Sequence, residues 1–124
     1  MTKVLLVVET PWARNGVHAA LTTPEFEIID HEDPQTAAAA TVANRVDVAV
    51  VDLQIAAMGG MAVARAVRDA STKNGAETPV VILIDRAADA FIAKRAGAAA
   101  WVTKPTDPHE LRAAIRSCVS SPEI

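Results

Sequence analysis

The chain has 124 residues, 51% of them hydrophobic, and a formal net charge of −3. This length suits a single domain, which we place at residues 1–124 with a core over about 3–119, and the hydrophobic content is enough to bury that core. The composition excludes a membrane span and a signal peptide, because no apolar run is long enough, and it argues against direct binding of nucleic acid, because such proteins are usually basic.

Short runs rich in β-branched residues alternate with alanine-rich stretches along the chain. The runs, which we expect to be strands, cover residues 3–8, 26–30, 47–52, 79–84 and 98–102. Helices are expected to follow them at about residues 12–22, 34–45, 60–73, 87–96 and 108–119. Strands that are apolar along their whole length are typical of a parallel sheet covered on both faces. The pattern therefore predicts an α/β fold, a three-layer doubly wound sandwich with the flavodoxin-like strand order 2-1-3-4-5.

Local signals support two of these helices and orient a third. Asp-Pro pairs at 33–34 and 107–108 place an N-cap and a first-turn proline before the second and fifth helices. In the helix expected at 60–73, every third residue from Met61 to Ala70 is apolar, which predicts the buried stripe. After the fifth helix, residues 120–124 are expected to fray.

Ligands of an open doubly wound sheet bind beyond the carboxyl ends of its strands. Asp52 ends the third strand there, where a carboxylate can act as a nucleophile or hold Mg²⁺, and Lys104 can contact a phosphoryl group. Considered alone, Asp52 is equally consistent with a residue that caps the next helix, and Lys104 is consistent with a solvated surface lysine. The residues that the strands bring to this edge are Glu9, Thr10, Asp52, Ile84, Asp85, Thr103, Lys104 and Pro105.

Two segments, VVDLQIAAMGGMAVARAVR at 50–68 and AGAAAWVTKP at 96–105, resemble those of a response-regulator receiver domain of the CheY-like superfamily. The resemblance extends over about residues 3–119. In the first segment Asp52 is followed at the family's spacing by an apolar residue, a methionine and a glycine, with alanine in place of the usual proline. These residues are Ile55, Ala56, Met58 and Gly60.

The second segment resembles the family's fifth strand and the turn before it. Gly97 lies in the Ala-Gly-Ala turn, and Trp101 stands where the family carries its switch aromatic. Lys104 matches the family's lysine, and Pro105 matches the proline that follows it in a cis peptide bond. These matches give the resemblance its specificity at the carboxyl edge of the sheet.

The resemblance implies a role in phosphorelay signalling. Asp52 would accept a phosphoryl group from a histidine kinase or a phosphotransfer protein, and Lys104 would pair with that group. Mg²⁺ would be held by Glu9, Asp52 and the main-chain carbonyl of Gln54. A hydroxyl residue at the end of the fourth strand and the aromatic Trp101 would then switch conformation. A protein of this class is expected in the cytoplasm and is not an enzyme.

The sequence departs from the family pattern in its acidic pair and at the switch position. Thr10 replaces the second acid after the first strand, so any Mg²⁺ is expected to bind weakly. Ile84 or Asp85, depending on register, takes the place of the hydroxyl, and neither donates a neutral hydroxyl hydrogen bond. The alternative is therefore an atypical receiver that acts as a protein-interaction module without phosphorylation.

Basic residues on the fourth and fifth helices form a second candidate surface. Arg86, Lys94 and Arg95 would join Arg112 and Arg116 in a strip on the helix 4–strand 5–helix 5 face. Members of the family often dock a downstream protein or a second copy of themselves there. A solvated helix face explains the same charges.

The remaining chemical signals are weak. A phosphatase of the same fold would carry Asp-x-Asp, but position 54 is Gln, and no G-x-G-x-x-G follows the first strand. His18, His31 and His109 lack metal-ligand spacing. Cys118 cannot form an internal disulfide and is expected to be a buried small hydrophobe. Trp12, near the same edge as Asp52, either shapes the acidic pocket or packs on the first helix.

Overall fold

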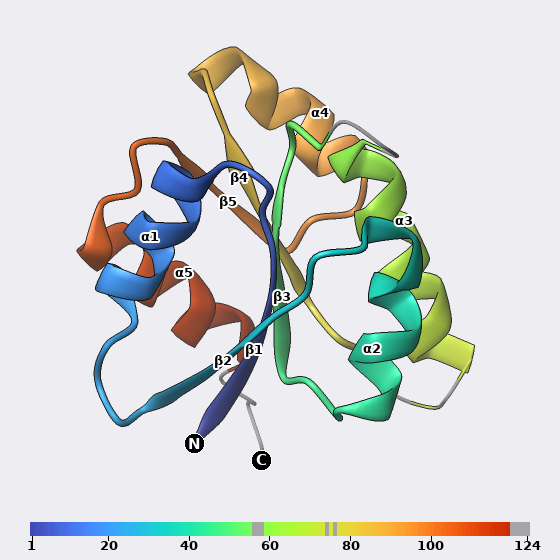
Figure 1. The fold of residues 1–124 in the computed structure, drawn as a ribbon. Coiled ribbons are helices and arrows are strands. Elements are labelled where there is room, and N and C mark those ends of the chain that lie inside the picture. Colours follow the sequence, from blue (N-terminus) through green and yellow to red (C-terminus); the bar gives the residue numbers. More distant parts are fainter. Residues whose placement is uncertain (56–58, 74, 76, 120–124) are drawn as a thin grey trace.

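A computed structural model describes residues 1–55, 59–73, 75 and 77–119, so the motif residues Ala56 and Met58 and the tail at 120–124 lie outside the described residues. Five parallel strands form one sheet in the order β2-β1-β3-β4-β5, which confirms the predicted flavodoxin-like topology (Figure 1). The strands are β1 (Thr2–Val7), β2 (Phe26–Asp30), β3 (Val48–Asp52), β4 (Val80–Ile84) and β5 (Ala100–Thr103). The helices are α1 (Pro11–Ala20), α2 (Ala37–Ala43), α3 (Gly60–Lys73), α4 (Ala90–Arg95) and α5 (Pro108–Val119).

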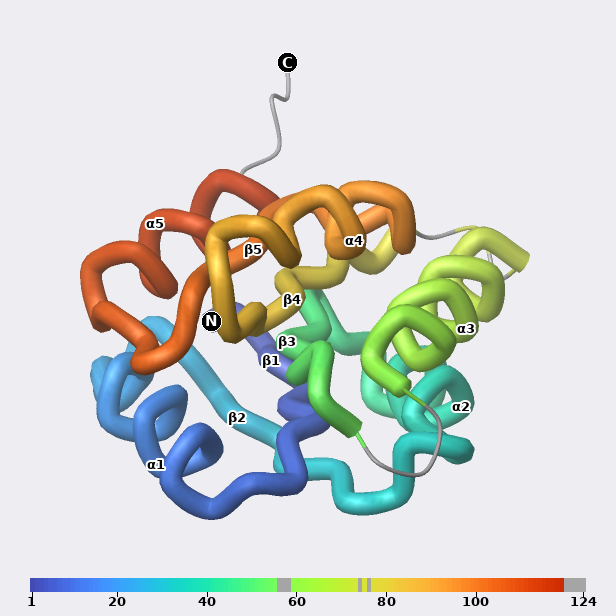
Figure 2. The backbone as a smooth tube through the Cα atoms, turned by 90° about the horizontal axis from the view of Figure 1, so that it is seen from above, coloured from blue at the N-terminus to red at the C-terminus, as the bar shows by residue number. Residues whose placement is uncertain are grey.

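The helices cover both faces of the sheet, as the continuous apolar strands predict. Figures 1 and 2 show α1 and α5 on one face and α2, α3 and α4 on the other. Successive side chains of a strand point to opposite faces, so each central strand contributes to two separate cores. In β3, for example, Val50 packs toward α1 and α5 while Val51 packs toward α2 and α3, and both are fully buried. No helix among the described residues is long and apolar enough to cross a membrane.

Several of the expected elements begin later than the sequence pattern indicates, and two of them show the reason. The helix expected from residue 34 starts as a 3₁₀ turn, Pro34–Thr36, in which the Asp33 carboxylate accepts a hydrogen bond from the Gln35 amide at 2.9 Å. The strand expected from residue 98 starts at Ala100, because the Ala98 amide still bonds to the carbonyl of Ala93 at the end of α4. In both places local turn geometry displaced the boundary.

The predicted stripe of α3 was only partly right. Ala64 and Val67 are buried, but Met61 and Ala70 are only half-buried, and Val63 and Ser71 take their places in the core. A strict step of three residues falls behind the 3.6-residue turn, so such a stripe drifts around the helix. The buried face instead combines steps of three and four.

Gly60, the first residue of α3, lies against the end of β3. Its amide donates to the Leu53 carbonyl at 3.2 Å. A Cβ atom at this position would overlap the carbonyl of Asp52 and lie 2.6 Å from the Cα atom of Leu53. Since both neighbours are backbone, neither can give way cheaply. Glycine at position 60 therefore lets α3 pack directly under the residue that ends β3.

We expect Gly60→Ala to lower the free energy of unfolding by about 1–3 kcal/mol, because the added methyl group must displace backbone at the end of β3. Urea unfolding measures this. Gly16→Ala is the matched control, since a Cβ atom at Gly16 in α1 meets nothing within 4 Å. That variant should gain about 0.5–1 kcal/mol from helix propensity. Equal effects of the two substitutions would show that the close packing of Gly60 is not required.

Candidate functional site

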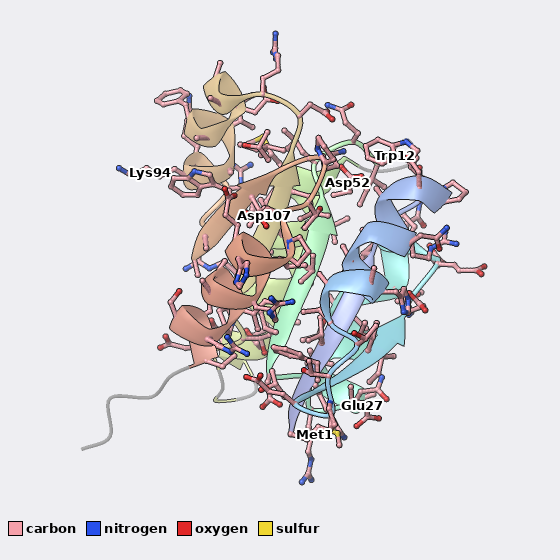
Figure 3. All side chains as sticks on the ribbon, turned by 90° about the vertical axis from the view of Figure 1, so that its left-hand side faces the viewer. Met1, Trp12, Glu27, Asp52, Lys94 and Asp107 are labelled. Carbon is pink, nitrogen blue, oxygen red and sulfur yellow. The ribbon has the colours of Figure 1, made fainter. Side chains whose placement is uncertain are left out.

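The carboxyl ends of the central strands lie level with one another. Figure 3 shows Asp52 and Trp12 near this end of the sheet, with Met1 and Glu27 at the opposite end. Residues that follow β1, β3, β4 and β5 therefore emerge at one edge, as the fold rule predicts. The last pairs of the ladders are Val7 with Val51, Asp52 with Leu83, and Ile84 with Thr103.

Asp52 and Lys104 form a buried ion pair at this edge. The Nζ atom of Lys104 lies 2.6 Å from Oδ1 of Asp52, and the two side chains are 5% and 0% exposed. The Gln54 amide donates to the same oxygen at 2.9 Å. Removing a carboxylate from water is costly unless charge and hydrogen bonds compensate it, and Oδ1 receives both. The structure thus brings together two residues that lie 52 positions apart in the sequence.

The second oxygen of the Asp52 carboxylate has a different environment. Oδ2 is buried and has no hydrogen-bond partner among the described residues. Buried polar atoms are nearly always paired, so an orphaned carboxylate oxygen at a strand end calls for an explanation. An oxygen with an uncommitted lone pair can ligate a cation or attack an electrophile. Oδ1 is fixed and Oδ2 is available, which orients Asp52 for either role.

Asp85 also reaches the site lysine. Its Oδ1 atom lies 3.1 Å from Nζ of Lys104, and its side chain is 41% exposed. Ile84, the neighbouring residue, is buried in the apolar core beneath α3 and α4. Of the two residues between which the sequence left the switch position open, Asp85 is therefore the one whose side chain contacts Lys104. Asp85 and Lys104 were both expected at this edge, but their contact was not predicted, because it depends on how far the lysine extends across the end of β4.

The turn after β1 is held by an arginine. The Nη2 atom of Arg14 in α1 donates to the carbonyls of Val8 at 3.2 Å and Glu9 at 3.3 Å. Glu9 is exposed at the end of the turn, and Thr10 occupies the N-cap position of α1. Arg14 thus fixes the backbone from which Glu9 projects. Nothing in the sequence pattern points to this role of Arg14.

The described residues at this edge offer few ligands for Mg²⁺. Among the described residues, no three or more His, Cys, Asp and Glu side chains form a cluster that could hold a metal ion. Mg²⁺ nevertheless needs only one or two carboxylates, because it keeps several of its waters. The orphaned Oδ2 of Asp52 meets that minimum, and Glu9 and the carbonyl of Gln54 come from adjoining turns. The residues therefore fit an ion that is held mainly by water and few protein ligands.

The structure also places the residues of the second motif. The Lys104–Pro105 peptide bond is cis, and Gly97 has a φ of +86°, a backbone conformation that favours glycine. Trp101 is 38% exposed in β5, and Phe91 is 65% exposed in α4. Trp12, the second residue of α1, is 58% exposed.

The predicted basic strip on α4 and α5 is not continuous. Arg116 pairs with Glu25 at 2.6 Å, and Arg112 donates to the carbonyl of Ala20 at the end of α1. These two arginines therefore bind groups beside α1 and β2 rather than extending a charged surface toward α4. The hydrogen bond from Arg116 lowers the pKa of Glu25.

The remaining singled-out side chains have structural partners. His18 lies 2.9 Å from Oδ2 of Asp30, and His31 lies 2.7 Å from the hydroxyl of Thr36. Cys118 is half-buried, and burial raises the pKa of its thiol. None of these contacts adds a functional group at the edge that carries Asp52.

Comparison with known proteins gives consistent matches over nearly the whole chain. A sequence model described as "Response regulator receiver domain" matches residues 4–116. The transcriptional regulatory protein CseB of Streptomyces avermitilis is 34% identical over 118 residues, which are 94% of this chain and 48% of that protein. The chain thus spans about half the length of the curated relatives it matches.

Solved structures match the fold equally well. The chemotaxis protein CheY4 of Vibrio cholerae has a TM-score of 0.80 and 28% identity, over 95% of this chain and 98% of that one. The receiver domain of the sensor histidine kinase PA1611 from Pseudomonas aeruginosa PAO1, solved with magnesium in its active site cleft, has a TM-score of 0.82. It is 20% identical over 97% of this chain and 98% of that chain, so this likeness concerns the fold alone.

We expect Lys104→Met to lower the free energy of unfolding by about 3–5 kcal/mol, because it leaves the Asp52 charge buried without its partner. Adding Asp52→Asn should restore most of that loss, since the charge is then gone as well. Urea unfolding of the wild type, both single variants and the double variant completes the cycle. A double variant as unstable as Lys104→Met would show that the lysine contributes through packing and not through the ion pair.

Proposed function

This chain belongs to the response regulator receiver domain family, which acts in two-component signalling, and we propose that Asp52 is its phosphoryl acceptor. One observation carries the proposal. Asp52 is buried at the sheet edge with Oδ1 held by Lys104 and the Gln54 amide and with Oδ2 unpaired among the described residues. A carboxylate with one oxygen anchored and the other available is arranged for attack.

The transfer step uses these groups directly. Oδ2 of Asp52 forms a bond to phosphorus while the bond from phosphorus to a histidine nitrogen of the donor breaks. The bonding electrons stay on that nitrogen, which takes up a proton from water, and the product is an acyl phosphate on Asp52. The Lys104 ammonium group offsets the negative charge of the phosphoryl oxygens, and the Gln54 amide keeps the carboxylate in place.

Receiver domains typically bind Mg²⁺, and we assign its ligands here to Glu9, Asp52 and the main-chain carbonyl of Gln54. When bound, the ion would neutralise charge on the transferring phosphoryl group. Thr10 supplies no charge where the family pattern has a second acid. We therefore propose that this chain holds Mg²⁺ more weakly than a site with two acids after β1.

Membership of this family implies a histidine kinase as partner. We propose that this kinase, or a phosphotransfer protein, supplies the phosphoryl group. The output partner, or a second copy of the chain, would dock on the face formed by α4, β5 and α5. Support for this face comes from two large aromatic side chains that project into solvent there, Phe91 and Trp101.

A second candidate function is a protein-interaction module that works without phosphorylation. The observation that favours it is the pair of substitutions at the site: Thr10 removes an acid, and Asp85 brings a carboxylate to the lysine that would meet the phosphoryl group. Both changes weaken a phosphoryl site. Under this alternative Asp52 and Lys104 are kept as a structural ion pair.

Incubation with acetyl phosphate and Mg²⁺ separates the two functions. We expect the intact mass of the wild-type chain to rise by one phosphoryl group, because Oδ2 of Asp52 is available to attack. Asp52→Asn should show no rise, and Asp69→Asn, an exposed carboxylate on α3, should behave as the wild type. An unmodified wild-type chain would instead support the interaction module.

Thr10→Asp should tighten Mg²⁺ binding by about tenfold, because one charge-assisted contact is worth about 1.5–3 kcal/mol before screening by water. Titration with Mg²⁺ by calorimetry measures the change. Thr10→Asn, whose side chain has the size of aspartate without its charge, is the control and should bind Mg²⁺ about as tightly as the wild type. If both variants bind Mg²⁺ equally, the ion does not lie beside position 10.

A further inference from the structure

Lys104 divides its ammonium group between two carboxylates of different character. Asp52 at 2.6 Å is fully buried, whereas Asp85 at 3.1 Å has a side chain that is 41% exposed. A lysine ammonium has three N–H donors, so these two contacts occupy most of them. Asp52 cannot separate from Lys104 without leaving an unpaired charge in the protein interior. The half-exposed partner can exchange the lysine for water.

We propose that Asp85 competes with the incoming phosphoryl group for Lys104 and so sets how tightly the site holds that group. The proposal rests on the proposed function, since it concerns the same acceptor, Asp52. Phosphoryl oxygens and the Asp85 carboxylate seek the same donors and repel each other as like charges. Asp85 must therefore turn outward before Lys104 can contact a phosphoryl group on Oδ2 of Asp52.

The local structure leaves Asp85 available for this role. The 3₁₀ turn that follows β4, Ala87–Asp89, is held by Asp89, whose carboxylate accepts from the amide of Arg86 at 3.2 Å. Within the described part of the chain, Lys104 is the partner of the Asp85 carboxylate. Asp85 therefore does not cap the turn, and its departure from Lys104 breaks no hydrogen bond of the backbone.

Charge at the site explains why one carboxylate matters. Lys104 contacts both Asp52 and Asp85. A phosphoryl group brings further negative charge to a lysine that already contacts two carboxylates. When Asp85 is displaced, the Lys104 ammonium group contacts only Asp52 and the phosphoryl oxygens. The competitor thus lowers the affinity of the unmodified site without touching the atom that reacts.

Beryllofluoride with Mg²⁺ is the probe for this competition, because it occupies the place of a phosphoryl group without a covalent step. Calorimetric titration of the full chain gives its affinity. We expect Asp85→Asn, which keeps the shape and removes the charge, to bind about five- to tenfold more tightly. Asp85→Glu restores the charge and should bind within about twofold of the wild type, and Asp69→Asn controls for the loss of one negative charge elsewhere.

The outcomes are distinct. Tighter binding by Asp85→Asn alone, or binding by that variant when the wild type shows none, supports the competition. Equal affinities of wild type and Asp85→Asn overturn it, while the mass rise with acetyl phosphate still upholds Asp52 as the acceptor. If no variant binds beryllofluoride and no mass rise occurs, the competition and the proposed function both fail. Urea unfolding confirms that each variant titrated is folded.

Discussion

The buried ion pair between Asp52 and Lys104 is the interaction on which the site depends. It joins β3 to β5 across the end of β4, so it forms only if the parallel strands end level and the lysine lies against the sheet. Gly60 permits α3 to pack under the end of β3. Apolar residues of the same length would fill this place at less cost than two charges. Keeping the charges is therefore better explained by chemistry than by stability.

The proposed chemistry depends on how Lys104 is shared between two carboxylates. Lys104 faces two carboxylates, and the turn after β1 carries Glu9 and an uncharged Thr10. A phosphoryl group on Asp52 needs cations near it, and among the described residues Lys104 is the cation that contacts Asp52. Under our proposals, this receiver domain has Asp52 as its acceptor, and Asp85 lowers its affinity for the phosphoryl group.

The sheet and the residues at its carboxyl edge could be predicted from the sequence, but not every contact between those residues. Continuous apolar strands predicted a parallel sheet, and the doubly wound pattern of five strands predicted its order. The rule for ligands of open sheets pointed to Asp52 and Lys104 before their distance was known. The contact of Asp85 with Lys104 and the bonds of Arg14 to the turn after β1 were not predicted, because each depends on how far a side chain extends. The stripe of α3 was misplaced where a pattern of three ignored the helical turn. Helical periodicity can be seen in a short stretch of sequence, and strand order follows from the pattern of the whole chain. The partner of a side chain depends instead on how neighbouring elements pack.

A crystal structure of the chain grown with Mg²⁺ and beryllofluoride tests the central claim most directly. The account predicts electron density for the probe on Oδ2 of Asp52, with Nζ of Lys104 in contact with it and the Asp85 carboxylate turned toward solvent. Density at another position, or a Lys104 that stays between Asp52 and Asp85 beside an occupied acceptor, would contradict it.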